Sequence, residues 1–204
     1  MRDQIERRFQ AVELLAEAGG EGNERAIVGY AAVFNSRSED LGGFVEVIQR
    51  GAFAGAQEGD VRALFNHDAN MVLGRTKAGT LAVSEDEIGL RIRITPPDTQ
   101  YARDLIHLIE RGDVSQMSFG FRTILDSWDT VGEETVRTLK QVALYDVSPV
   151  TFPAYAATSV QMRAMMNVPE VPAGVRGATA PAFDEGQLRA QAAMRQREIE
   201  ILTA

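Results

Sequence analysis

The sequence predicts an α+β domain that is mainly β, built as a barrel or sandwich with helices attached. Short apolar runs, separated by Gly, Asp and Glu, follow one another closely between residues 61 and 94. One of these runs, 88–94, alternates strictly in polarity, and a segment after residue 96 has the spacing of a helix. The chain has 204 residues, of which 45% are hydrophobic and 25% charged, so its composition is that of a globular protein with a core.

The N-terminal part predicts a β-hairpin followed by a short strand. Residues 7–16 and 25–34 are two extended runs, and the segment 18–23 between them is rich in the glycine and asparagine of turns. The segment 13–18 (ELLAEA), which begins at the end of the first run, is also compatible with a short helix. A polar loop at 35–40 leads to a short strand at 44–48.

Four closely spaced strands are predicted next, at 61–65, 71–75, 80–84 and 88–94. The last has the clearest pattern. Its apolar residues Ile88, Leu90, Ile92 and Ile94 alternate with Gly89, Arg91 and Arg93. This period of two indicates a half-buried strand.

One helix is predicted after the sequence Pro96–Thr99. A single apolar stripe at i, i+4, i+7 and i+8 consists of Tyr101, Leu105, Leu108 and Ile109. Gly112 is placed to end this helix. Strand-like segments return at 114–125, 135–144 and 146–151.

The composition changes near residue 166, which divides the chain into three parts. Residues 1–165 are predicted to form the folded domain. Residues 166–183 combine Pro and Gly with small apolar residues, as linkers do. Residues 184–204 predict a helical tail that is weakly amphipathic and suited to docking or oligomer formation.

Several classes of function are disfavoured by composition alone. The absence of cysteine excludes disulfides, thiolate metal sites and a cysteine nucleophile. A net charge of −8 without a basic cluster argues against nucleic-acid binding, and no apolar run is long enough for a membrane span. No secretory signal or cofactor motif is visible, and two isolated histidines argue against zinc. We therefore expect a protein of the cytoplasm without cofactor or metal.

His67 is the first candidate for chemistry. It ends an apolar run and precedes a polar loop, where folds usually present functional side chains. A loop histidine held by ordinary hydrogen bonds fits the same pattern. The other histidine, His107, falls on the helix face opposite the apolar stripe, so we expect it to be exposed.

Ser118 is the second candidate, within the sequence MSFGF. Met117, Phe119 and Phe121 are expected to anchor the strand on one face, while Ser118 and Gly120 face outward. A residue without a side chain at 120 would let a substrate backbone approach the hydroxyl. An ordinary half-exposed strand has the same pattern.

Asp146 is the third candidate, because it interrupts an apolar strand. A carboxylate there needs a cation or hydrogen-bond donors, or an edge position that faces water. A hydroxyl, an imidazole and a carboxylate on separate strands are the components of serine hydrolysis. The acids Asp126 and Asp129, on either side of Trp128, favour a solvated loop over a metal site.

Four blocks in the correct order, within residues 5–165, resemble the prohead maturation proteases of tailed bacteriophages. The blocks are 29–53 (GYAAVFNSRSEDLGGFVEVIQRGAF), 64–68 (LFNHD), 117–121 (MSFGF) and 145–158 (YDVSPVTFPAYAAT). These are capsid-maturation serine peptidases of the HK97 type. The resemblance implies a herpesvirus-assemblin-like fold, a β-barrel core with surrounding helices.

The resemblance also implies roles for the three candidates. His67 would be the general base, Ser118 the nucleophile and Asp146 the orienting acid, with Glu110 and Asp68 as competing acids. For the oxyanion hole two alternatives are considered, the backbone amides near 119–120 and those of the turn at 148–151. Arg50 departs from the family, which often has proline just before the GAF sequence.

The function implied is a serine endopeptidase acting inside an assembling procapsid in the bacterial host cytoplasm. It would cleave the scaffolding part of the capsid protein and also itself, with a cut expected within 165–185, and it would be a homo-oligomer. The alternatives are a non-catalytic assembly module of the same fold and a small esterase or amidase.

Overall fold

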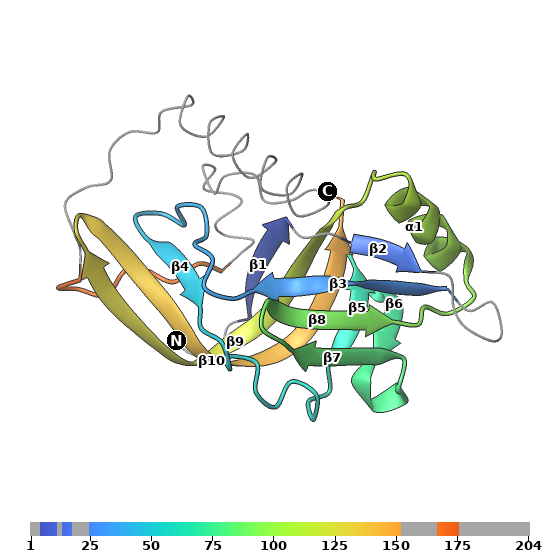
Figure 1. Ribbon diagram of the computed structural model, residues 1–204, viewed down its shortest axis with the longest axis horizontal. Helices are drawn as coiled ribbons and strands as arrows, with labels where there is room; N and C mark the ends of the chain where they lie inside the picture. The colour runs from blue at the N-terminus through green and yellow to red at the C-terminus, as the bar shows by residue number, and fades with distance from the viewer. Residues whose placement is uncertain (1–4, 12–13, 18–24, 152–166, 176–204) are drawn as a thin grey trace.

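All strands in the described residues belong to two hydrogen-bonded sheets (Figure 1). The computed structural model describes residues 5–11, 14–17, 25–151 and 167–175. The six-stranded sheet has the order β1–β9–β10–β5–β6, with β4 also paired to β10, and the four-stranded sheet has the order β2–β3–β8–β7. The strands are β1 (Glu6–Ala11), β2 (Leu14–Glu17), β3 (Ala26–Val33), β4 (Val45–Ile48), β5 (Arg62–Phe65), β6 (Asp68–Arg75), β7 (Leu81–Glu85), β8 (Gly89–Ile94), β9 (Gln116–Val131) and β10 (Glu134–Val150).

The predicted α+β class, mainly β, is confirmed. The described residues contain one α-helix, α1 (Gln100–Glu110), and one short 3₁₀ helix, η1 (Thr76–Ala78). The helix buries the side predicted from its apolar stripe, centred on Leu105 and Ile109, and Gly112 follows it at a positive φ of 82°. The described strands form two separate sheets instead of one closed barrel.

The predicted N-terminal hairpin is only half correct. β2 pairs with β3 as expected, but β1 leaves this sheet and pairs with β9 in the other one. The single run at 7–16 is therefore divided between two sheets. The physical reason lies in Glu6 and Arg8, two buried charged residues of β1 whose partners are on β4 and β10.

The two strands predicted at 135–144 and 146–151 are one strand, β10, paired with β9 along its length. Figure 1 shows the pair as a long hairpin. The solvated loop expected around Asp126 and Asp129 is wrong, because both residues lie within β9. Asp126 accepts hydrogen bonds from Arg137 and Trp128, which hold this part of the chain as strand.

A one-residue irregularity in β10 changes which face its side chains occupy. Leu144 pairs with Phe121, but Asp146 pairs with Gly120, so Tyr145 is an extra residue on β10. Leu144 and Val147 both face the core, although an uninterrupted strand would place them on opposite faces. The irregularity therefore moves Asp146 away from the core face.

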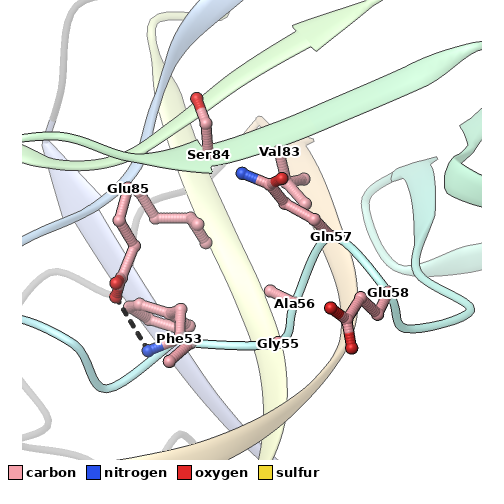
Figure 2. Close-up of a pocket in the computed structure, with 10 residues that line it drawn as sticks. Phe53, Gly55, Ala56, Gln57, Glu58, Val83, Ser84 and Glu85 are labelled. Carbon is pink, nitrogen blue, oxygen red and sulfur yellow. Dashed lines mark hydrogen bonds between the residues drawn. The ribbon is translucent and has the colours of Figure 1, made fainter.

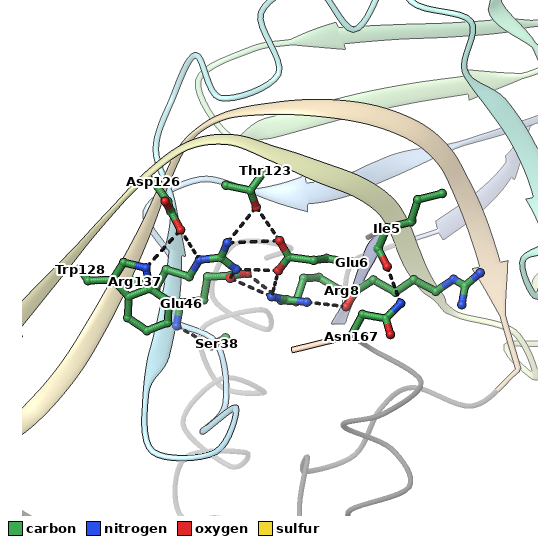
Figure 3. Close-up of polar contacts among 11 residues, drawn as sticks. Ile5, Glu6, Arg8, Ser38, Glu46, Thr123, Asp126, Trp128, Arg137 and Asn167 are labelled. Atoms are coloured by element: carbon green, nitrogen blue, oxygen red, sulfur yellow. Dashed lines mark hydrogen bonds and ion pairs between the residues drawn. The ribbon is translucent and has the colours of Figure 1, made fainter. Parts of the chain in front are cut away.

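Five charged residues form a buried ion cluster between β1, β4, β9 and β10. Figure 3 shows these residues, which are Glu6, Arg8, Glu46, Asp126 and Arg137. The Arg137 guanidinium bonds to Glu6 at 2.6 Å, to Glu46 at 2.8 Å and to Asp126 at 2.8 Å. Arg8 bonds to Glu46 through two nitrogens, at 2.8 and 2.9 Å. The cluster thus joins four strands through charge-assisted hydrogen bonds.

Ionisation of Glu6 depends on the arginines around it. Burial opposes its negative charge, but a hydrogen bond from Arg137 and the charges of Arg8 and Arg137 outweigh burial and lower the pKa of Glu6. For Arg137, burial opposes the charged form, while the Glu6 hydrogen bond and the Glu46 charge outweigh it and raise the pKa. The neighbouring charges and hydrogen bonds of the cluster therefore favour the charged forms of both Glu6 and Arg137.

The described part of the predicted linker, 167–175, contains no helix or strand but contacts the domain. The Asn167 side chain donates to the carbonyl of Ile5 at 2.6 Å, and the Val175 carbonyl accepts from Thr130 at 3.1 Å. Val168 and Val171 pack near Leu41 and Phe44. The predicted tail helix at 184–204 lies outside the described residues. Within the described residues, no helix combines the length and the hydropathy that a membrane crossing requires.

We predict that Arg137→Met destabilises the protein by about 3–5 kcal/mol, because it leaves three carboxylates without their shared cation. The control is Arg93→Met, which breaks an exposed pair with Glu17 and should cost less than about 1 kcal/mol. Urea unfolding of both variants measures the difference. Equal losses would show that the ion cluster does not stabilise the fold.

Candidate active site

His67 lies in the two-residue turn that joins β5 to β6. Phe65 pairs with Asp68, so Asn66 and His67 alone form the loop. Both have positive φ, 54° and 56°, which is the backbone of a type I′ turn. Such a turn is tight, and it holds the imidazole at the end of the hairpin beside the last residues of β10.

Ser118 lies on β9 with its side chain on the face opposite the core. Met117, Phe119 and Phe121 are buried in the core, as the alternation predicts. Ser118 pairs directly with Ser148 of β10. The expectation of an outward-facing hydroxyl needs correction, because Ser118 has no exposed surface in this structure.

The structure brings His67, Ser118 and Asp146 together as a hydrogen-bonded trio. His67 Nδ1 lies 2.5 Å from Asp146 Oδ1, and His67 Nε2 lies 2.6 Å from Ser118 Oγ. This network assigns the imidazole proton to Nδ1, which donates to the carboxylate, and leaves Nε2 to accept from the hydroxyl. Their catalytic roles remain a prediction at this point.

The trio is held in a nearly water-free position. The side chains of His67 and Asp146 are 9% and 12% exposed. The ring of Phe9 meets the imidazole edge to face, with centroids 6.3 Å apart. Low access to water strengthens the hydrogen bonds within the trio.

Ser148 is a contact of the trio that the sequence did not identify. Its hydroxyl donates to Asp146 Oδ1 at 2.9 Å and lies 3.3 Å from His67 Nδ1. Ser148 has no exposed surface. A second donor on the same oxygen holds the carboxylate in place while it accepts from the imidazole. The signal in the sequence was the spacing of Asp146 and Ser148, two residues apart and hence on one face of a strand.

Gly120 serves a purpose different from the one expected. A Cβ at this position would lie 2.3 Å from Asp146 Oδ2, so the carboxylate occupies the space of the missing side chain. The expected approach of a substrate backbone over Gly120 is therefore wrong in this structure. Any side chain at position 120 would have to displace this carboxylate from its present position beside His67.

The competing candidates lie elsewhere. Glu110 of α1 pairs with Arg25 at 2.7 Å and with His107 at 3.2 Å, and His107 is exposed as predicted. Asp68 follows His67 but accepts from Asn70. Ser115, a second serine close to Ser118 in sequence, is exposed and precedes β9. None of these side chains is hydrogen-bonded to the trio.

A hollow of about 200 Å³ lies between residues 53–58 and strands β7 and β8 (Figure 2). Glu85 of β7 accepts a hydrogen bond from the Phe53 amide at 2.8 Å on its wall. No residue of the trio lines this hollow. Among the described residues, no group of three or more His, Asp or Glu side chains is placed to hold a metal ion.

A family model and a sequence relative both indicate one family. The model of the family described as Caudovirus prohead serine protease matches residues 10–170. The prohead protease of Enterobacteria phage HK97 is 34% identical over 142 residues, covering 66% of this chain and 58% of the relative. The chain thus matches less than two thirds of that relative's length. The solved structure of the bacteriophage T4 capsid assembly protease aligns with a TM-score of 0.43 and 12% identity, covering 71% of this chain and 98% of the other.

We predict that Gly120→Ala breaks the hydrogen bond between His67 and Asp146. The new methyl group occupies the position of Asp146 Oδ2, and the carboxylate turns away because it is the free end of a side chain. A crystal structure of the variant measures the distance. As control, Gly132→Ala, where nothing lies within 4 Å of the new methyl, should leave the trio in place. A His67–Asp146 contact kept below about 3 Å in Gly120→Ala would contradict the packing argument.

Proposed function

Because the chain belongs to the Caudovirus prohead serine protease family, we propose that it is a serine endopeptidase of procapsid maturation. In this proposal Ser118 is the nucleophile, His67 the general base and Asp146 the acid that orients the imidazole. The observation that carries it is the continuous hydrogen-bonded chain from hydroxyl through imidazole to carboxylate, at 2.6 and 2.5 Å. The herpesvirus-assemblin-like architecture is part of the same proposal.

In the proposed mechanism, the acyl group of the peptide substrate is transferred to Ser118 and then to water. Ser118 Oγ forms a bond to the carbonyl carbon of the peptide while its proton passes to His67 Nε2. The imidazolium then gives that proton to the amine nitrogen, and the C–N bond breaks to leave an acyl group on Ser118. A water molecule next bonds to the acyl carbon as its proton passes to His67, and Ser118 Oγ departs with the returned proton.

Asp146 supports both proton transfers without changing its own protonation. It accepts from His67 Nδ1 and so holds the tautomer in which Nε2 is free to act as base. It also stabilises the positive charge that the imidazole acquires. Ser148 keeps the accepting oxygen in place through its own hydrogen bond. One amide considered for the oxyanion hole is already occupied, because the Thr151 N–H donates to Asn66.

The proposed substrate is the scaffolding part of the capsid precursor, cleaved inside the procapsid within the host cytoplasm. The chain itself is a second substrate, with a cut within 165–185, and it acts as a homo-oligomer. Support comes from the family to which the chain belongs. The relative from phage HK97 is itself a prohead protease.

We predict that Ser118→Ala abolishes processing of the capsid precursor, because no other hydroxyl in the described residues is bonded to His67 Nε2. Co-expression of the full chain with the precursor, followed by gel analysis of the particles, measures the loss. Ser115→Ala is the matched control, since this exposed serine makes no contact with the trio, and should process normally.

The same particles test self-cleavage. Mass spectrometry should find a cut between residues 165 and 185 in the wild type and none in Ser118→Ala. Processing by Ser118→Ala at the wild-type rate would refute the peptidase assignment and leave the non-catalytic assembly module.

The burial of Ser118 leads to a further prediction, that the isolated chain is largely idle and becomes active in the procapsid. A nucleophile without exposed surface cannot meet a peptide bond, so the face above it must open. A fluorophosphonate should label Ser118 at least tenfold faster in procapsids than in dilute solution. Equal rates in both preparations would exclude gating by assembly.

A further inference from the structure

Asn66, the neighbour of His67, fastens the turn to the end of β10. Its side-chain Oδ1 accepts from the Thr151 N–H at 2.9 Å, and its Nδ2 donates to Thr151 Oγ1 at 2.8 Å. Its backbone N–H donates to the carbonyl of Pro149 at 3.0 Å. The turn is thus bound at two points, to Pro149 of β10 through the backbone and to Thr151, just after β10, through the amide side chain.

Thr151 lies directly after the strand that carries the acid. Asp146 and Ser148 come from the last residues of this strand, β10. β5, which precedes the turn, pairs with β10 at only two positions, Asp146 with Arg62 and Val147 with Ala63. The regular pairing between these strands therefore ends before the turn, where one backbone bond, from the Asn66 N–H to the Pro149 carbonyl, remains. The Asn66–Thr151 contact continues the connection to the height of the imidazole.

Asparagine satisfies two requirements at this position. It adopts positive φ more readily than other residues with side chains, and its amide supplies both the acceptor and the donor that Thr151 uses. Glycine would satisfy only the backbone. The residue type therefore indicates a role in addition to turn formation.

We propose that Asn66 is a positioning residue for catalysis, acting through Thr151 to hold the His67 imidazole between Ser118 and Asp146. This inference rests on the proposed function and adds a residue to it. Asn66 does not touch the reacting atoms. Its effect arises because an imidazole displaced by about 1 Å loses proton transfer, which can cost about 100-fold in rate.

Asn35 offers a matched comparison for a purely structural role. It is exposed like Asn66, has the same φ of 54°, and its N–H donates to the carbonyl of Ile48 at 2.9 Å. It lies in the turn after β3, and none of the contacts of the trio involves it. Asn35→Gly therefore reproduces the backbone change of Asn66→Gly without removing the contact between the Asn66 side chain and Thr151.

The experiment compares Asn66→Gly, Asn35→Gly and Ser118→Ala in procapsids assembled from the full chain and the capsid precursor. We expect Asn66→Gly to slow precursor processing by about 10- to 100-fold, and Asn35→Gly to process within about twofold of the wild type. Saturation kinetics with a fluorophosphonate separate the maximal inactivation rate from probe binding. Asn66→Gly should lower the former and leave the latter unchanged, which a general loss of fold would not do.

Thr151→Val tests whether Asn66 acts through this partner. It should slow processing less than Asn66→Gly, because the Thr151 N–H remains, and the double variant should be no slower than Asn66→Gly alone. If the rate losses of the two single variants multiply in the double variant, Asn66 does not act through Thr151. Normal processing by Asn66→Gly, with none by Ser118→Ala, would overturn this inference and leave the proposed function intact. Processing by Ser118→Ala would instead refute the proposed function.

Discussion

The extra residue at Tyr145 determines where the acid of the trio lies. In an uninterrupted strand Asp146 would share the face of Leu144 and lie in the core, where its carboxylate would be buried without an imidazole. The one-residue irregularity turns Asp146 and Ser148 together onto the face of Ser118, while Val147 keeps the core filled. The relative positions of all the hydroxyl and carboxylate groups in the site depend on this change.

The ion cluster and the hydrogen-bonded trio lie on opposite faces of the six-stranded sheet. Glu6 and Arg8 of β1 contribute to the ion cluster, while Phe9, on the other face, contacts the ring of His67. β9 and β10 also supply residues to both groups. The ion cluster holds β1 beside β9 and β4 beside β10, so the strands that carry Ser118 and Asp146 have fixed neighbours within the sheet. The stability of the fold and the geometry of the site therefore both depend on the backbones of β9 and β10.

Local patterns predicted the elements whose neighbours are near in sequence. The alternation in β8 and the apolar stripe of α1 are decided by burial along one element, so both were predicted, except that Ile88 precedes β8 and is exposed. β1 was assigned to the wrong partner, because its pairing depends on Glu46 and Arg137, which lie far along the chain. The residues Asp126 and Asp129 were assigned to a loop for the same reason: polar composition does not reveal a distant arginine.

The site shows the same division between local and distant information. Residue type and resemblance predicted His67, Ser118 and Asp146 as site residues, and their side chains lie together. The use predicted for Gly120 differs from the structure, because the role of this residue depends on a carboxylate 26 positions further along the chain. The apolar residues of β10 contain a usable signal, since Leu144 and Val147 cannot both face the core without an extra residue between them. A break in the alternation of apolar residues next to an acidic residue is therefore more informative than either feature alone. It indicates that the strand places that acid on the face opposite the core.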